Sequence, residues 1–190
     1  MIDSSKLPKP ARLNPRYLDG ATERPGMAPQ ARAVIYAERI SDKADAKTSN
    51  ETKELAQQHL QFEKSVLPVQ VGTTVHFPNR DEVFHNVFSY SAPKSFDLGR
   101  YRAGEEPGEV VFDQPGEVQV FCEIHRHMRT TVLVLDTPYF TVSNDSNTYD
   151  LKDLPAGDYR VSIWYGPGKT LSKEVTLTDE ENLKIDWSEE

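Results

Sequence analysis

The chain has 190 residues, which is enough to bury a hydrophobic core and fits one large domain or two small ones. Its formal net charge of −8, from 30 acidic and 22 basic residues, argues against a nucleic-acid partner. No apolar run approaches the about 20 residues of a membrane-spanning helix, so we expect no membrane span. The chain has 1 cysteine, which excludes an internal disulfide.

The N-terminal part of the chain is poor in apolar side chains. Its first 30 residues are rich in proline, which is typical of an extended arm. Residues 31–40 predict a strand, and the polar residues 41–54 predict a surface loop with at most a helical turn. We therefore expect residues 1–54 to form an N-terminal arm with one strand and a polar loop. The start of the chain lacks the basic-then-apolar plan of a signal peptide, as in a cytoplasmic protein or a mature extracytoplasmic one.

From residue 55 onward the pattern is that of β-strands throughout. Short alternating segments, separated by turn residues, lie at 71–77, 83–90, 109–113, 117–122 and 130–136. Several short strands at such spacing predict an all-β sandwich or barrel. Residues 131–135 are apolar on both faces, which predicts a strand in a sheet that is covered on both sides.

Residues 138–190 continue with short strands. About fifty residues cannot readily close a sandwich, so these strands need others, and the predicted strand at 31–40 is the candidate. Within this segment, residues 153–161 resemble the turn signature of the carboxypeptidase-regulatory-like β module, which implies no catalysis. We expect a small β-rich C-terminal module.

The segment from Cys122 to Met128 has the spacing Cys-x2-His-x2-Met, with His125 at its centre. Soft sulfur ligands together with imidazole select copper, and one thiolate, two imidazoles and a weak axial thioether form an electron-transfer site. The second imidazole has to come from elsewhere in the chain, and His85 is the candidate. The alternation of residues 117–122 points the thiol inward from the end of a strand.

Residues 57–137 resemble the cupredoxins, the blue-copper family of plastocyanin and amicyanin. The resemblance rests on the pattern V-x-x-G-x-x-V-x-F-x-N that ends at Asn79, on His85-Asn86-Val87, on Pro115-Gly116, and on the Cys-x2-His-x2-Met motif. It implies a Greek-key β-sandwich, predicted here over residues 55–137. It also implies one copper ion bound by the residues that match the family's ligands, namely His85, Cys122, His125 and Met128.

The resemblance further implies a type 1 copper protein that carries single electrons between redox partners in the periplasm or another extracytoplasmic space. No acid–base dyad, nucleophile motif or phosphate-binding loop is evident in the sequence, so we expect no enzyme activity. Three alternatives stay open: a copper carrier or storage protein, a subunit of a copper-dependent oxidoreductase, and an interaction module with a vestigial metal site.

Two departures from the family pattern concern the axial ligand. Members often have proline just after the second histidine, whereas Arg126 and His127 stand here before Met128. His127 and Glu123 are therefore alternatives to Met128 as the last ligand.

Basic residues gather in sequence near the predicted site, at Arg100, Arg102, Arg126 and Arg129. They are either ordinary solvated side chains or a positive rim that steers an acidic redox partner.

Overall fold

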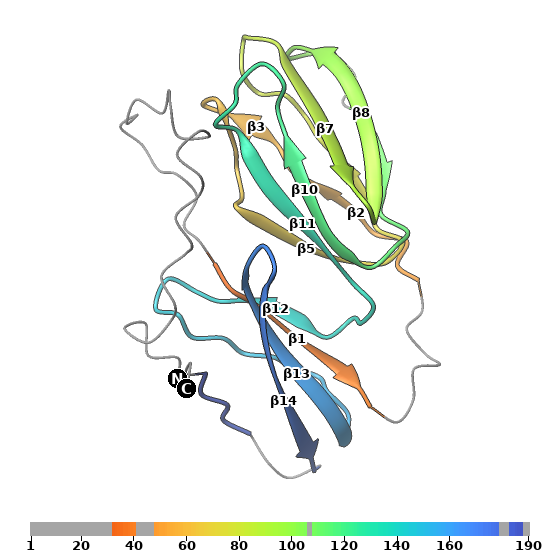
Figure 1. Cartoon of the computed structure of the whole chain (residues 1–190), viewed down its shortest axis with the longest axis vertical. Coiled ribbons are helices and arrows are strands. Elements are labelled where there is room, and N and C mark those ends of the chain that lie inside the picture. The colour runs from red at the N-terminus through yellow and green to blue at the C-terminus, as the bar shows by residue number, and fades with distance from the viewer. Residues whose placement is uncertain (1–31, 41–47, 106–107, 179–182, 188–190) are drawn as a thin grey trace. The chain divides into compact units, whose positions relative to one another are not determined.

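The computed structural model describes residues 32–40, 48–105, 108–178 and 183–187. Every regular element in these ranges is a β-strand, which confirms the predicted all-β class (Figure 1). The arm predicted over the first 30 residues lies outside the described residues, as do residues 41–47 of the predicted polar loop. No helix in the described ranges is long and apolar enough to cross a membrane.

The described residues form two compact units, one of them within residues 48–135. This unit has a five-stranded sheet with the order β5-β11-β10-β7-β8. Its strands are β5 (Val66–Gln70), β7 (His85–Ser91), β8 (Lys94–Tyr101), β10 (Gly116–Phe121) and β11 (Arg129–Leu135). A three-stranded sheet contains β2 (Thr52–Glu54), β6 (Thr74–His76) and β9 (Glu109–Val111), and a hairpin pairs β3 (Gln57–Gln58) with β4 (Gln61–Phe62).

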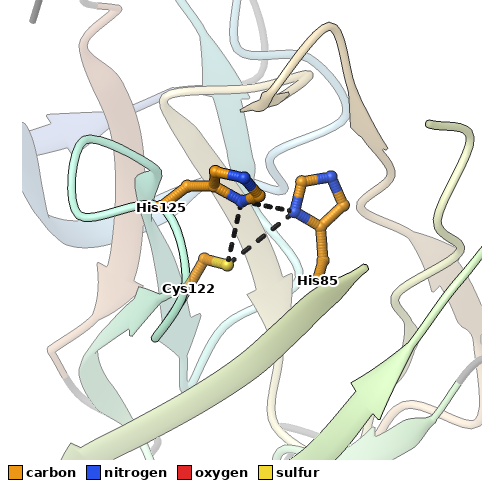
Figure 2. A group of neighbouring side chains, drawn as sticks. All are labelled: His85, Cys122 and His125. Atoms are coloured by element: carbon orange, nitrogen blue, oxygen red, sulfur yellow. Dashed lines mark hydrogen bonds between the residues drawn. The ribbon is translucent and has the colours of Figure 1, made fainter. Parts of the chain in front are cut away.

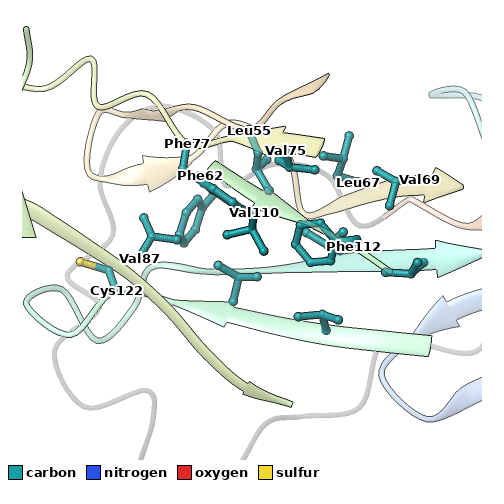
Figure 3. Packing of buried hydrophobic residues seen from close by; sticks show 14 of the residues in the cluster. Leu55, Phe62, Leu67, Val69, Val75, Phe77, Val87, Val110, Phe112 and Cys122 are labelled. Carbon is teal, nitrogen blue, oxygen red and sulfur yellow. The ribbon is translucent and has the colours of Figure 1, made fainter. Parts of the chain in front are cut away.

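A hydrophobic core fills this unit and receives side chains from both larger sheets (Figure 3). The alternation of β10 places Val118 and Val120 inward, and Val75 and Phe77 come from β6 and its end. Strand β11 is buried from its second residue to its last, as its apolar pattern predicts, because it lies between β5 and β10. Cys122 belongs to the same core.

The other unit has a four-stranded sheet with the order β12-β1-β13-β14. Its strands are β1 (Val34–Arg39), β12 (Phe140–Val142), β13 (Gly157–Gly166) and β14 (Lys169–Leu177). Strand β1 pairs with both β12 and β13, so the predicted N-terminal strand joins the C-terminal strands in one sheet. The boundaries at residues 54 and 137 stay predictions.

One segment predicted as loop is a strand. Thr52–Glu54 pairs in parallel with β6 as β2, although its side chains are polar and largely exposed. Strand β8 was not predicted either, because its Lys94, Asp97 and Arg100 interrupt the apolar pattern at the edge of the sheet. Backbone pairing at a sheet edge needs no apolar side chains, and composition alone does not reveal it.

Candidate metal centre

Three of the predicted ligands meet at one end of the five-stranded sheet. His85 is the first residue of β7, Cys122 follows the last residue of β10, and His125 lies in the loop between β10 and β11 (Figure 2). The Cys122 Sγ lies 3.8 Å from the His85 Nδ1 and 3.7 Å from the His125 Nδ1, and the two Nδ1 atoms are 3.1 Å apart. Two strands and a short loop thus direct three donor atoms to one point.

The loop that carries His125 is closed at its base by backbone hydrogen bonds. The Cys122 N–H donates to the Met128 carbonyl at 3.2 Å, which extends the β10–β11 ladder beyond the Phe121–Arg129 pair. Inside the loop, the Met128 N–H donates to the His125 carbonyl at 2.9 Å. The loop is therefore a tight turn, and it holds His125 above the buried thiol.

The spacing of the three donor atoms suits a single metal ion. First-row ions such as zinc bind imidazole nitrogen at about 2.0–2.1 Å and thiolate sulfur at about 2.3 Å. Donors that share one ion at such distances are separated by roughly 3–4 Å, because their bonds diverge by about the tetrahedral angle. The measured separations of 3.1, 3.7 and 3.8 Å fall in this range.

The second ring nitrogen of His85 is bound by a carboxylate. The His85 Nε2 lies 2.9 Å from the Asp81 Oδ2, and the His85 side chain is fully buried. A neutral imidazole that donates its Nε2–H to this carboxylate has a free lone pair on Nδ1, which faces Cys122. Such a partner on the far nitrogen sets the tautomer and the ring orientation of a histidine ligand.

The electrostatics of the cluster favour an anionic sulfur. Burial opposes ionisation of Cys122, but a hydrogen bond with His85 and the backbone N–H groups of Asn86, His125 and Ile124 outweigh it, so the thiol pKa lies below its ordinary value. Burial would lower the pKa of His85, but its hydrogen bonds with Cys122 and Asp81 raise it overall.

The other sulfur of the motif is also buried. Met128 is 1% exposed and belongs to the core cluster that includes Cys122. Its role as axial ligand stays a prediction.

The two alternatives to Met128 have partners elsewhere. His127 is exposed, and its Nε2 donates to the Leu60 carbonyl at 2.8 Å. The Glu123 carboxylate accepts from Arg100 at 3.0 Å, and both side chains are more than half exposed. In this arrangement neither side chain joins the cluster of His85, Cys122 and His125.

Two of the four arginines of the predicted basic rim lie next to carboxylates. Arg100 is paired with Glu123, and Arg102 lies 3.8 Å from a carboxylate oxygen of Glu105. Arg126 is exposed within the ligand loop.

Asp81 was not recognised in the sequence as part of the site. It stands four residues before His85 in a polar segment, where an aspartate is ordinary. The only available signal was the Asp-x3-His spacing. This spacing does not predict a contact between the two side chains unless the conformation of the chain between them is known.

The fold and the donor set define a copper-binding β-sandwich, because a thiolate with two imidazoles in an apolar core is a copper donor set. Residues 48–135 match the model of the family "Copper binding proteins, plastocyanin/azurin family". This match confirms the resemblance to the cupredoxins that residues 57–137 show in the sequence. The cofactor of this chain is a single copper ion.

Solved structures that resemble part of this chain include a purple cupredoxin from Nitrosopumilus maritimus, with 24% identity, a TM-score of 0.39, and cover of 44% of this chain and 99% of that one. A reduced mutant of amicyanin has 22% identity and a TM-score of 0.42, covering 53% and 99%. A Cu-containing nitrite reductase from Thermus scotoductus has 25% identity and a TM-score of 0.42, covering 52% of this chain but 25% of that one. No curated protein matches the chain.

Proposed function

We propose that the protein is a type 1 copper protein that transfers single electrons between redox partners. His85, Cys122, His125 and Met128 would hold the copper ion, with the thioether of Met128 as the weakest of the four donors. The observation that carries the proposal is a distance: two imidazole Nδ1 atoms and the Sγ of a buried thiol lie within 3.8 Å of one another. The pKa of this thiol lies below its ordinary value.

A copper ion bound there supplies a one-electron couple. The contribution of the chain is to hold the ligands still, because an electron carrier works best when both oxidation states fit the same site. His85 is held by Asp81, and Cys122 is held by backbone N–H groups and by the core around it. Burial of His85 and Cys122 keeps water away from the metal position.

His125 is the ligand through which an electron is expected to leave. Its side chain is half-buried, whereas His85 and Cys122 are fully or almost fully buried. Exposed apolar side chains stand next to the ligands in the chain: Phe84 precedes His85, and Ile124 precedes His125. Exposed apolar side chains of this kind are suited to brief contact with a partner protein.

Voltammetry of the copper-loaded protein tests electron transfer against copper carriage. An electron carrier gives a reversible one-electron wave and retains its copper in both states. A copper carrier with the same donors exchanges copper rapidly with a chelator and gives no reversible wave, and this result would refute the proposal.

Replacement of the axial sulfur should shift the spectrum only moderately. In Met128→Ala the three strong donors stay, so the visible thiolate-to-copper band should persist with a changed position and intensity, and the reduction potential should change. Arg126→Ala, an exposed change in the same loop, is the control. His127→Ala should shift the band less than Met128→Ala does, because its imidazole is directed to the Leu60 carbonyl. A large shift in His127→Ala with little change in Met128→Ala would place His127 in the coordination sphere instead.

We further propose an extracytoplasmic location and an acidic redox partner. Arg126 and the half-buried Arg129 are the residues of the predicted rim nearest in sequence to His125. Oxidation of the reduced protein by the anion hexacyanoferrate(III) should therefore slow as salt is added. Salt screens the attraction, because the Debye length falls to about 10 Å at 0.1 M. Arg126→Glu should slow the reaction at low salt. A rate that is independent of salt would exclude a positive rim.

A further inference from the structure

The β3–β4 hairpin has an unusual turn close to the metal site. Its two central residues, His59 and Leu60, have φ angles of 56° and 58°. A turn with two residues in the left-handed region ordinarily contains asparagine, aspartate or glycine, and a bulky side chain such as that of Leu60 is strained there. Something outside the hairpin must hold this turn in place.

Asp81 supplies that hold. Its Oδ1 accepts the His59 N–H at 2.6 Å, and its Oδ2 accepts the Leu60 N–H at 2.8 Å. The Asp81 backbone N–H in turn donates to the side-chain oxygen of Asn79, a buried residue, at 2.8 Å. The Asp81 backbone is thus held by Asn79 while the Asp81 carboxylate binds both N–H groups of the turn.

The same carboxylate oxygen also binds a metal ligand. The Asp81 Oδ2 that accepts the Leu60 N–H lies 2.9 Å from the His85 Nε2. The orientation of the His85 ring and the conformation of the hairpin tip therefore depend on one group.

The carbonyl group of Leu60 contacts the loop that carries His125. The Leu60 carbonyl accepts a hydrogen bond from the His127 Nε2 at 2.8 Å. His127 lies in the loop that carries His125, whereas His85 is 40 residues earlier in the chain than His125. Leu60 thus connects, through its N–H and its C=O, the two segments that carry the imidazole ligands.

We propose that the hairpin tip, His59–Leu60, is a brace that fixes the His125 loop relative to His85, with Asp81 and His127 as positioning residues. This inference rests on the proposed function for its purpose. The brace holds the two imidazoles at the copper spacing before the metal arrives. It also limits their movement when the oxidation state changes. In this role His127 stabilises the site through Leu60 and does not bind the metal.

The first test uses His127 in the full-length, metal-free protein. In His127→Ala the loop loses its contact with Leu60, so the amide hydrogens of residues 122–128 should exchange about tenfold faster, as expected when one stabilising bond is lost. His127→Gln should restore slow exchange, because its amide group can donate to the same carbonyl. Arg126→Ala, a neighbouring exposed change, is the control. Unchanged exchange in His127→Ala would overturn the brace, whether or not copper binds.

The second test measures copper. Loss of a hydrogen-bond partner of a metal ligand typically costs about 10–100-fold in affinity, and we expect this loss for Asp81→Ala and a smaller one for His127→Ala. Because both act through one turn, the double variant should lose less than the product of the single losses. The electron paramagnetic resonance spectrum of Cu(II) should broaden in both. Strictly multiplicative losses, or a parent-like spectrum in both, would overturn the proposal.

The two proposals fail in different ways. Absence of the thiolate-to-copper band in the parent protein would refute the type 1 site. The brace would then still be tested by the exchange experiment, which uses the metal-free protein. A normal band together with parent-like exchange in His127→Ala would refute the brace alone.

Discussion

Cys122→Ser should abolish the intense visible band of the copper-loaded protein. The band arises from charge transfer between a thiolate and Cu(II), and Cys122 is the single cysteine of the chain. A serine hydroxyl stays protonated at neutral pH and binds copper weakly. The loss in copper affinity should therefore exceed the about 10–100-fold that removal of a ligand's hydrogen-bond partner costs. Visible absorption during a Cu(II) titration measures both effects.

The control for this experiment is a small change at another buried site in the same sheet. Ser89 on β7 is fully buried, and Ser89→Ala should keep the band at parent intensity. Circular dichroism should show the same β content in all three proteins. A band that survives in Cys122→Ser would mean that the chromophore is not a thiolate complex, and the type 1 assignment would fall.

Phe77→Ala should destabilise the copper unit by about 3–5 kcal/mol, the usual cost when a buried phenylalanine leaves a cavity. Phe77 is completely buried in the core, and its ring centroid lies 5.8 Å from that of Phe96. A domain is typically stable by only about 5–15 kcal/mol, so this loss is a large part of the total.

The measurement must report on the correct unit. The 2 tryptophans of the chain are Trp164 and Trp187, and both lie in the other unit, so their fluorescence does not follow this core. Hydrogen exchange of the amides of β10 and β11 does. Phe84→Ala is the matched control, because Phe84 is 42% exposed and its ring lies against the Arg102 guanidinium, 4.4 Å from the ring centroid. That contact is worth about 0.5–1 kcal/mol. Equal losses in the two variants would contradict the described packing.

For the proposed ligands that lie close together in the sequence, proximity in space was predictable. Cys122 and His125 are joined by a short loop, and the alternation along β10 indicates which way the thiol points, so local spacing contains the necessary geometry. His85 was found because the donor set was one imidazole short. The structure places its Nδ1 within 3.1 Å of that of His125.

The supporting contacts were not predictable, because they depend on how distant segments meet. Leu60, Asp81 and His127 are ordinary in their local context, and no periodicity connects them. Their hydrogen bonds appear only after the hairpin, the segment before β7 and the ligand loop converge. His127 illustrates the point: its sequence position next to Met128 suggested a ligand, whereas the fold gives it the Leu60 carbonyl.

X-ray absorption at the copper K edge can decide whether Cys122 and two imidazoles bind the metal, because it reports the atoms bound to copper in the loaded protein. With one equivalent of Cu(II), we expect one short sulfur contact and two imidazole nitrogens, with the sulfur absent in Cys122→Ser. Coordination by nitrogen and oxygen alone in the parent protein would contradict a site made of His85, Cys122 and His125.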